Sequence, residues 1–179
     1  MKQILCIVML FLVSFTLWAG VFMEVETRTL SGEDFLFPHD ALKQEPAIFA
    51  LAMSTNQKNG EQQQDELLLW HTYLIDSGMV PESMEIYHFP VIGSAPFFVR
   101  GLIRRGISAS FVPTVRDDRA AVLFVRDTDR FARSAGIPLD DQPSLALVLP
   151  GGITAGYLKG PVNEENIEKL RKLLDAYLP

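Results

Sequence analysis

The sequence predicts an α/β fold, a three-layer sandwich with a mixed β-sheet in the middle. Three apolar runs, each suited to a buried strand, alternate along the chain with segments of helical periodicity. Nearer the C-terminus, two further apolar runs are separated only by a tight turn, and a last amphipathic segment follows them. Strands joined through helices lie parallel because such crossovers are right-handed, whereas a tight turn makes an antiparallel pair. The predicted order is therefore βαβαβα, a β-hairpin and a final helix.

The first predicted strand covers residues 47–53 and is followed by a helix. The run AIFALAM is continuously apolar, long enough for a buried parallel strand and too short for a helix. Asn59, with Gln62 three residues later, has the capping-box spacing that begins a helix. Gly78 is predicted to end this helix. Its buried face carries Leu67, Trp70 and Leu74.

Two more strand–helix units are predicted after this helix. The second strand is expected at residues 84–89, closed by Pro90, and the third at residues 120–125. A short helix is expected between them at residues 96–106. Another follows the third strand at residues 128–135.

The C-terminal part is predicted to form a hairpin and a helix. Residues 144–149 and 153–158 are the two strands, and Pro150-Gly151-Gly152 makes the turn. Asn163 caps the last helix. This helix has an apolar stripe and two exposed charge pairs at a spacing of four residues: Ile167, Leu170, Leu174 and Tyr177, and Glu165/Lys169 and Glu168/Lys172.

The first 23 residues resemble a membrane-targeting leader. Residues 4–23 carry no charge, Lys2 precedes them, and Glu24 and Glu26 follow. A cleaved signal peptide would end after Ala19 or Gly20, whereas an uncleaved signal-anchor helix of about 20 residues would span about 30 Å. Either alternative exports residues 24–179, a single domain, to the non-cytoplasmic side. The domain is then membrane-anchored, or periplasmic or secreted if the leader is cleaved.

Cysteine usage and charge exclude several classes of function. The only cysteine, Cys6, lies in the leader, so the body cannot perform disulfide exchange, thiol peroxidase chemistry or any other thiolate reaction. His39, His71 and His88 lack the spacing of metal ligands, and we expect neither a metal site nor a cofactor. The formal net charge of −6 argues against general nucleic-acid binding.

Two short motifs suggest a family. Leu30-Ser31-Gly32 followed by residues 35–38, and Gln142-Pro143-Ser144-Leu145 before the hairpin, are similar to segments of the thioredoxin-like superfamily. The resemblance covers residues 30–178. It implies a cis bond at Gln142–Pro143, with Pro143 facing the loop after the first core strand. Where that superfamily carries Cys-x-x-Cys, this chain has Ser54, Thr55, Asn56 and Gln57. The active loop is therefore degenerate.

Within that superfamily, the sequence most resembles a cysteine-less group. Phe37-Pro38, the Gln62-Gln63-Gln64…Trp70 helix and Phe89-Pro90-Val91-Ile92 are similar to segments of the mitochondrial ATP synthase assembly factor family and its bacterial relatives. This resemblance implies a non-redox protein that binds protein partners. Its task would be the assembly or maturation of a membrane complex at the outer face of the membrane.

The arginines are concentrated in one segment. Eight of the ten lie in residues 100–133, where they face four aspartates and give a local net charge of +4 in an otherwise acidic body. Such a surface could dock an acidic partner or anionic headgroups. The alternative is that these arginines only pair with the nearby aspartates. Under the first interpretation, the candidate partner surface is Arg100, Arg104, Arg105, Phe97 and Phe98, with the three arginines projecting to solvent.

Two other functions stay open. An enzyme could reuse the fold for non-thiol chemistry around His88, Asp141 and Ser54, although no hydrolase motif surrounds Ser54. A small-ligand carrier could use the empty loop as its pocket.

Overall fold

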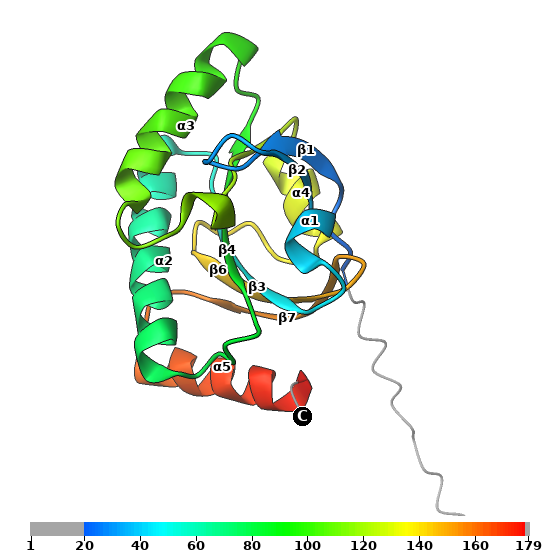
Figure 1. Cartoon of the computed structure of the whole chain (residues 1–179), viewed down its shortest axis with the longest axis vertical. Coiled ribbons are helices and arrows are strands. Elements are labelled where there is room, and N and C mark those ends of the chain that lie inside the picture. Colours follow the sequence, from blue (N-terminus) through cyan, green and yellow to red (C-terminus); the bar gives the residue numbers. More distant parts are fainter. Residues whose placement is uncertain (1–19, 178–179) are drawn as a thin grey trace, which may run out of the picture.

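A mixed five-stranded sheet, with strand order β5-β4-β3-β6-β7, forms the centre of the molecule (Figure 1). The computed structural model describes residues 20–177. Strands β3, β4 and β5 are parallel, and β6 and β7 continue the sheet antiparallel from β3. The predicted mixed sheet is thus confirmed. The strand bounds are Ala47–Met53 for β3, Ile86–Gly93 for β4, Leu123–Val125 for β5, Ser144–Leu149 for β6 and Ile153–Lys159 for β7.

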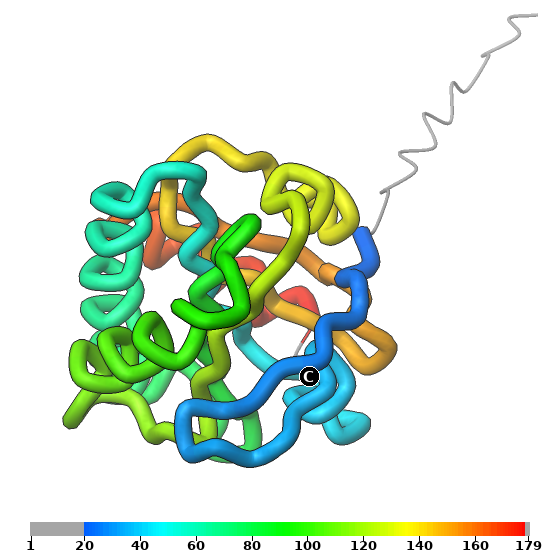
Figure 2. The backbone as a smooth tube through the Cα atoms, turned by 90° about the horizontal axis from the view of Figure 1, so that it is seen from above, coloured from blue at the N-terminus to red at the C-terminus, as the bar shows by residue number. Residues whose placement is uncertain are grey.

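Helices cover both faces of the sheet, which confirms the three layers. One face carries the long helices α2, α3 and α5, and the other carries α1, α4 and a β1–β2 hairpin (Figures 1 and 2). Their bounds are Gln57–Ser77 for α2, Phe97–Phe111 for α3, Glu164–Tyr177 for α5, His39–Leu42 for α1, Thr128–Ser134 for α4, Val25–Arg28 for β1 and Asp34–Phe37 for β2. A 3₁₀ turn spans Asp117–Arg119.

The central strand β3 shows why its sequence is apolar throughout. All seven of its residues are buried, because helices cover both sides. Phe49 and Leu51 face an aromatic cluster on the α1 and α4 side. Ala50 and Ala52 face α2 on the opposite side. Small residues there let the long helix, with Trp70 at its centre, lie close to the sheet.

The folded domain includes residues that the sequence assigned to the leader. Phe22 is only 3% exposed and contacts the rings of Phe37, Phe49 and Phe131. Its N–H donates to the Gly152 carbonyl at 2.9 Å, and the Gly20 carbonyl accepts from Thr154. The domain therefore extends at least to Gly20, ahead of the predicted boundary at residue 24. The predicted leader helix falls mostly on residues 1–19, outside the described part. From residue 20 to residue 177, no helix is long and apolar enough to cross a membrane.

Two predicted boundaries around α2 and β4 are wrong. Asn56, not Asn59, caps α2, since its side chain accepts from the Asn59 N–H at 3.3 Å. Strand β4 does not stop at Pro90 but runs on to Gly93. Pairing with the next strand persists on both sides of that proline: Ala121 N donates to His88 O, and Ser94 N donates to Val125 O.

Helix α3 is longer than predicted and β5 is shorter. Gly106 does not end α3, because Ile107 and Phe111 beyond it are buried in a cluster with Val122. That packing outweighs the cost of an interior glycine, about 1 kcal/mol. Ala120 and Ala121 make isolated bridges to β4 and Thr29, respectively, instead of a regular ladder. The β1–β2 hairpin was not predicted as strands.

Candidate functional site

The segment that follows β3, Ser54–Gln57, is called the closed loop below, because a buried glutamine fills the space behind it. Gln63 on α2 is 1% exposed. Its Oε1 accepts from Met53 N at 2.9 Å, and its Nε2 donates to Met53 O at 2.9 Å and to Asn59 Oδ1 at 2.6 Å. The side-chain amide thus pairs both backbone groups of the last β3 residue, as a neighbouring strand would.

The loop before β6 lies against the closed loop, as the resemblance implied. Ser54 Oγ donates to Asp141 Oδ1 at 3.1 Å, and Asn59 Nδ2 donates to Asp141 O at 3.0 Å. The implied cis bond at Gln142–Pro143 is wrong, because the cis bonds in the described chain are Phe37–Pro38 and Val112–Pro113. The chain turns instead at Asp141, whose φ is +58°. Pro143 then enters β6 with its carbonyl accepting from Gly160 N at 3.0 Å.

The three residues of the enzyme hypothesis are not brought together by their hydrogen bonds. Ser54 contacts Asp141, but His88 is 1% exposed and its Nε2 lies 3.1 Å from Nδ1 of His71 on α2. Burial, and to a lesser degree the charge of His71, lowers the pKa of His88 to about 3. Burial also lowers the pKa of His71. The lowered pKa values favour the neutral form of both rings near pH 7, and an imidazole with a pKa as low as that of His88 is too weakly basic to be an effective general base.

The sequence interpretation missed this histidine pair. His71 follows Leu67 by four residues and so lies on the face of α2 that packs on the sheet. His88 occupies a position of β4 that pairs with Ala50. Both features could have predicted a contact between the two histidines, since the small side chains of Ala50 and Ala52 on β3 leave room for an imidazole beneath α2.

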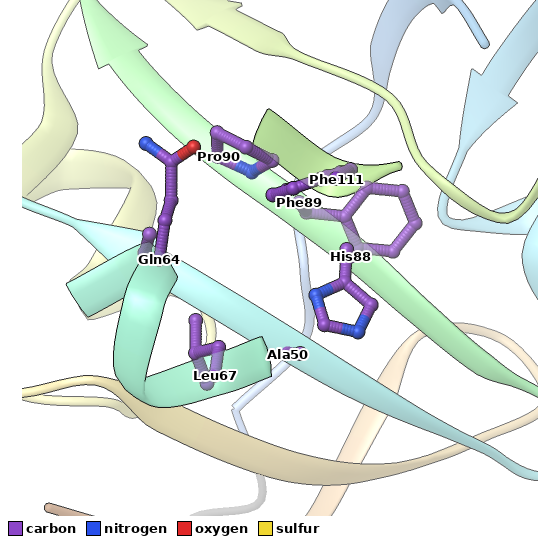
Figure 3. A pocket seen from close by; sticks show the side chains of 8 residues that line it. Ala50, Gln64, Leu67, His88, Phe89, Pro90 and Phe111 are labelled. Atoms are coloured by element: carbon purple, nitrogen blue, oxygen red, sulfur yellow. The ribbon is translucent and has the colours of Figure 1, made fainter. Parts of the chain in front are cut away.

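A narrow cavity lies between α2 and β4 beside the histidine pair. His88, Leu67 and Gln64 line it, with Phe111 closing the side toward α3 (Figure 3). The cavity has no volume that a water molecule could occupy. It therefore offers no room for a carried ligand. Within residues 20–177, no three His, Cys, Asp or Glu side chains gather as they would around a metal ion.

The outer side of α3 presents an exposed apolar surface, called the α3 patch below. Phe97 is 87% exposed, Phe98 is 84% exposed and Leu102 is 67% exposed. Arg105 is exposed beside them. Large apolar side chains are usually covered in a monomer, and a contiguous exposed group commonly marks an interaction surface. The first turn of α3 projects from the top of the molecule in Figure 1, away from the sheet.

Six of the eight arginines in residues 100–133 divide into two groups, and the other two, Arg126 and Arg130, are exposed. Three arginines pair internally, as the alternative interpretation expected. Arg116 pairs with Asp118, Arg119 pairs with Glu85 and Asp118, and Arg133 pairs with Asp129. Arg100, Arg104 and Arg105 form no ion pair with any carboxylate in the described chain. The expectation that all three project to solvent is right for Arg105 only. Arg100 and Arg104 are half-buried over the ring of Phe124.

Comparison with solved structures identifies the fold. Yeast Sco1 is 12% identical over 89% of this chain and 97% of that chain, with a TM-score of 0.58. BsSco, a member of the Sco family of cytochrome c oxidase assembly proteins, is 13% identical over 89% and 94%, with a TM-score of 0.52. The reduced 2-Cys peroxiredoxin of Plasmodium vivax is 9% identical over 88% and 93%, with a TM-score of 0.51. No protein-family profile and no curated protein matches the sequence.

The chain has a thioredoxin-like fold. The likenesses show the fold that the sequence motifs suggested, but they do not support the narrower likeness to the ATP synthase assembly factors. In this thioredoxin-like domain, the position expected for the reactive cysteines holds the closed loop, whose polar groups form hydrogen bonds with neighbouring side chains and backbone. Among residues 20–177, the most exposed aromatic side chains lie on a different element, α3.

Proposed function

We propose that this chain is a non-redox thioredoxin-like protein that binds a protein partner through the α3 patch. The observation that carries the proposal is the pair of adjacent phenylalanines, Phe97 and Phe98, each more than four-fifths exposed. Aromatic residues that are buried only on association dominate the energy of many protein interfaces. Exposed arginine beside them, here Arg105, is the other residue type enriched at such interfaces.

The setting of this activity is the non-cytoplasmic side of a membrane, and the task is the assembly or maturation of a membrane complex. The uncharged segment at residues 4–23 supports export. The resemblance to the ATP synthase assembly factor family supports the task, as does the description of BsSco, which shares the fold. The non-redox part rests on the absence of cysteine after Cys6.

Association is tested by recovery of partners from detergent-solubilised native membranes. The full-length chain is compared with the double variant Phe97→Ser/Phe98→Ser and with Leu69→Ser/Ile75→Ser. The latter pair is also exposed, at 58% and 61%, but lies on α2. We expect the amount of partner recovered with the α3 variant to be about tenfold lower than with the wild type, or lower still, because two interface aromatics are lost. The α2 variant should recover as much as the wild type. Equal recovery by the α3 variant and the wild type would contradict the proposal.

The non-redox character is tested by insulin reduction and peroxide turnover. The wild-type chain and a Cys6→Ser variant should both be inactive, because no thiolate remains in the body to attack a disulfide or peroxide. The melting temperature of the wild-type chain should not change when dithiothreitol is added. A reductant-dependent activity in the Cys6→Ser variant would contradict this part.

A further inference from the structure

Arg100 and Arg104 form a paired basic site on the side of α3 that contacts Phe124. They lie one helical turn apart, and their guanidinium carbons lie 4.9 Å and 5.2 Å from the centroid of the same Phe124 ring. Figure 2 shows the course of α3 and of the β1–β2 hairpin. Thr27 on β1 accepts a hydrogen bond from Arg104, and the positive charge of Arg28 acts on Arg104. Both guanidinium groups thus contact the ring of Phe124 and lie near each other.

The hydrogen bonds of this pair are incomplete. Arg100 Nε donates to Ala95 O at 3.1 Å, and Arg104 Nη2 donates to Thr27 Oγ1 at 3.3 Å. Arg104 Nε is buried and has no hydrogen-bond partner in the described chain. A buried donor without an acceptor is costly, and an incoming acceptor would remove that cost.

The charges are also uncompensated. Neither arginine is ion-paired to a carboxylate within residues 20–177, while Arg28 already pairs with Asp34. Burial, and then the positive charges of Arg100 and Arg28, lowers the pKa of Arg104. Like charges gathered at a half-buried position repel one another. An anion bound between them would turn this repulsion into attraction.

We propose that Arg100 and Arg104 bind the carboxylate of an aspartate or glutamate in the protein partner, an inference that rests on the docking function of the α3 patch. The planar guanidinium group suits bidentate capture of a carboxylate. Arg100 and Arg104 follow Phe97 by three and seven residues, so the three side chains lie on the same side of α3. A partner segment with an apolar residue beside an acidic one would therefore fit both Phe97 and the arginine pair. The apolar contact would supply most of the affinity, and the carboxylate would fix the orientation.

The test uses N-acetylglutamate and inorganic phosphate as probes of the full-length chain in a non-ionic detergent. The readout is the side-chain Nε–H signals of the arginines in ¹⁵N NMR spectra. N-acetylglutamate should shift the signals of Arg100 and Arg104 in a saturable way, and added sodium chloride should weaken the effect because the site is half-open to solvent. Arg104→Gln should abolish the Arg100 shift. Arg126→Gln, which removes an exposed arginine near α4, should leave it unchanged.

Each outcome decides one point. No shift with either probe would overturn the site, and a stronger response to phosphate than to the carboxylate would overturn the choice of a protein carboxylate in favour of a phosphate group. The Arg104→Gln variant should keep the wild-type melting temperature or exceed it, since the substitution relieves repulsion. Phe97→Ser/Phe98→Ser should still bind N-acetylglutamate. If it does so while partner recovery is also unchanged, the docking function fails and the carboxylate site stands.

Discussion

The closed loop and the α3 patch place opposite kinds of side chain in opposite environments. At and behind the closed loop, Ser54 and Asn59 donate to the side chain and the backbone carbonyl of Asp141, and Gln63 donates to Met53 O and to Asn59. At the α3 patch, Phe97 and Phe98 are apolar and face solvent. The stability of the monomer does not explain this arrangement at the α3 patch, because exposed phenylalanines contribute nothing to folding.

The difference supports the place of association that we propose. A thioredoxin-like domain with a reactive loop needs that loop to be accessible, whereas here a buried amide fills the space behind it. Ser54 and Asn56 form hydrogen bonds within the domain, although residues 55–57 are exposed. The surface that we propose for recognition is the side of α3, where exposed apolar side chains lie beside an exposed arginine. Four predictions test this contrast, ordered from the largest expected effect to the smallest.

The largest effect should come from Gln63. Gln63→Leu removes the partners of both Met53 N and Met53 O, leaving two buried backbone groups unsatisfied. We expect a loss of about 3 kcal/mol in the free energy of unfolding, measured by urea denaturation. Gln62→Leu is the matched control, since Gln62 is exposed one position earlier on the same helix. A change below about 1 kcal/mol for Gln63→Leu would show that the loop is not held closed by this amide.

Acid should destabilise the protein through the buried histidine pair. Unfolded histidine has its ordinary pKa near 6.5, whereas folded His88 has a pKa of about 3. The unfolded state therefore binds more protons below pH 6.5, and stability falls as the pH decreases from about 6.5 toward 3. Near pH 5, the expected loss from His88 is about 2 kcal/mol.

The matched variants separate this pair from other acid effects. His88→Leu should flatten the fall in stability between pH 7 and pH 5, because it removes the group with the strongest shift. His39→Gln should keep the wild-type fall, since His39 is exposed on the other face of the sheet. Urea denaturation at several pH values provides the measurement. If His88→Leu kept the full pH dependence, His88 would not be the group responsible.

The sequence predicted the elements whose pattern is local. The continuous apolar run of β3, the turn at Gly151-Gly152 and the cap at Asn163 each depend on neighbouring residues, and all are confirmed. Element lengths were less predictable when tertiary contacts decide them. Gly106 looked like a stop signal until Ile107 and Phe111 were seen to pack on the sheet.

The site residues divide in the same way. The loss of cysteine at Ser54–Gln57 is visible in the sequence, but the role of Gln63 is not, because it depends on a contact with Met53 across the loop. Phe22 could not be separated from the leader, since an apolar residue suits a lipid phase and a protein core equally. The cis bond at Gln142–Pro143 was predicted from a short motif. The structure has no cis bond there, and the backbone of the preceding residue Asp141 has a positive φ.

A smaller effect is expected at the surface of the closed loop. Ser54→Ala removes a donor to Asp141 and an acceptor for Asn56 N, both of which are partly open to water. Water can replace these bonds, so the expected loss is about 0.5–1 kcal/mol. Thr55→Ala, an exposed neighbouring control, should have no measurable effect. A loss as large as that of Gln63→Leu would mean that the Ser54–Asp141 bond, and not the buried amide, closes the loop.

The smallest effect on stability should come from the most drastic change in polarity. Phe97→Ser/Phe98→Ser replaces two rings by hydroxyl groups, but both rings are already in water in the folded state. We expect the free energy of unfolding to stay within about 0.5 kcal/mol of the wild type, as for other exposed positions. Urea denaturation of the same preparations used for partner recovery measures it. A large loss of stability would show that the rings contribute to the fold, and the loss of partner could then no longer be assigned to the surface. Unchanged stability with lost recovery is the combination that separates a docking surface from a structural one.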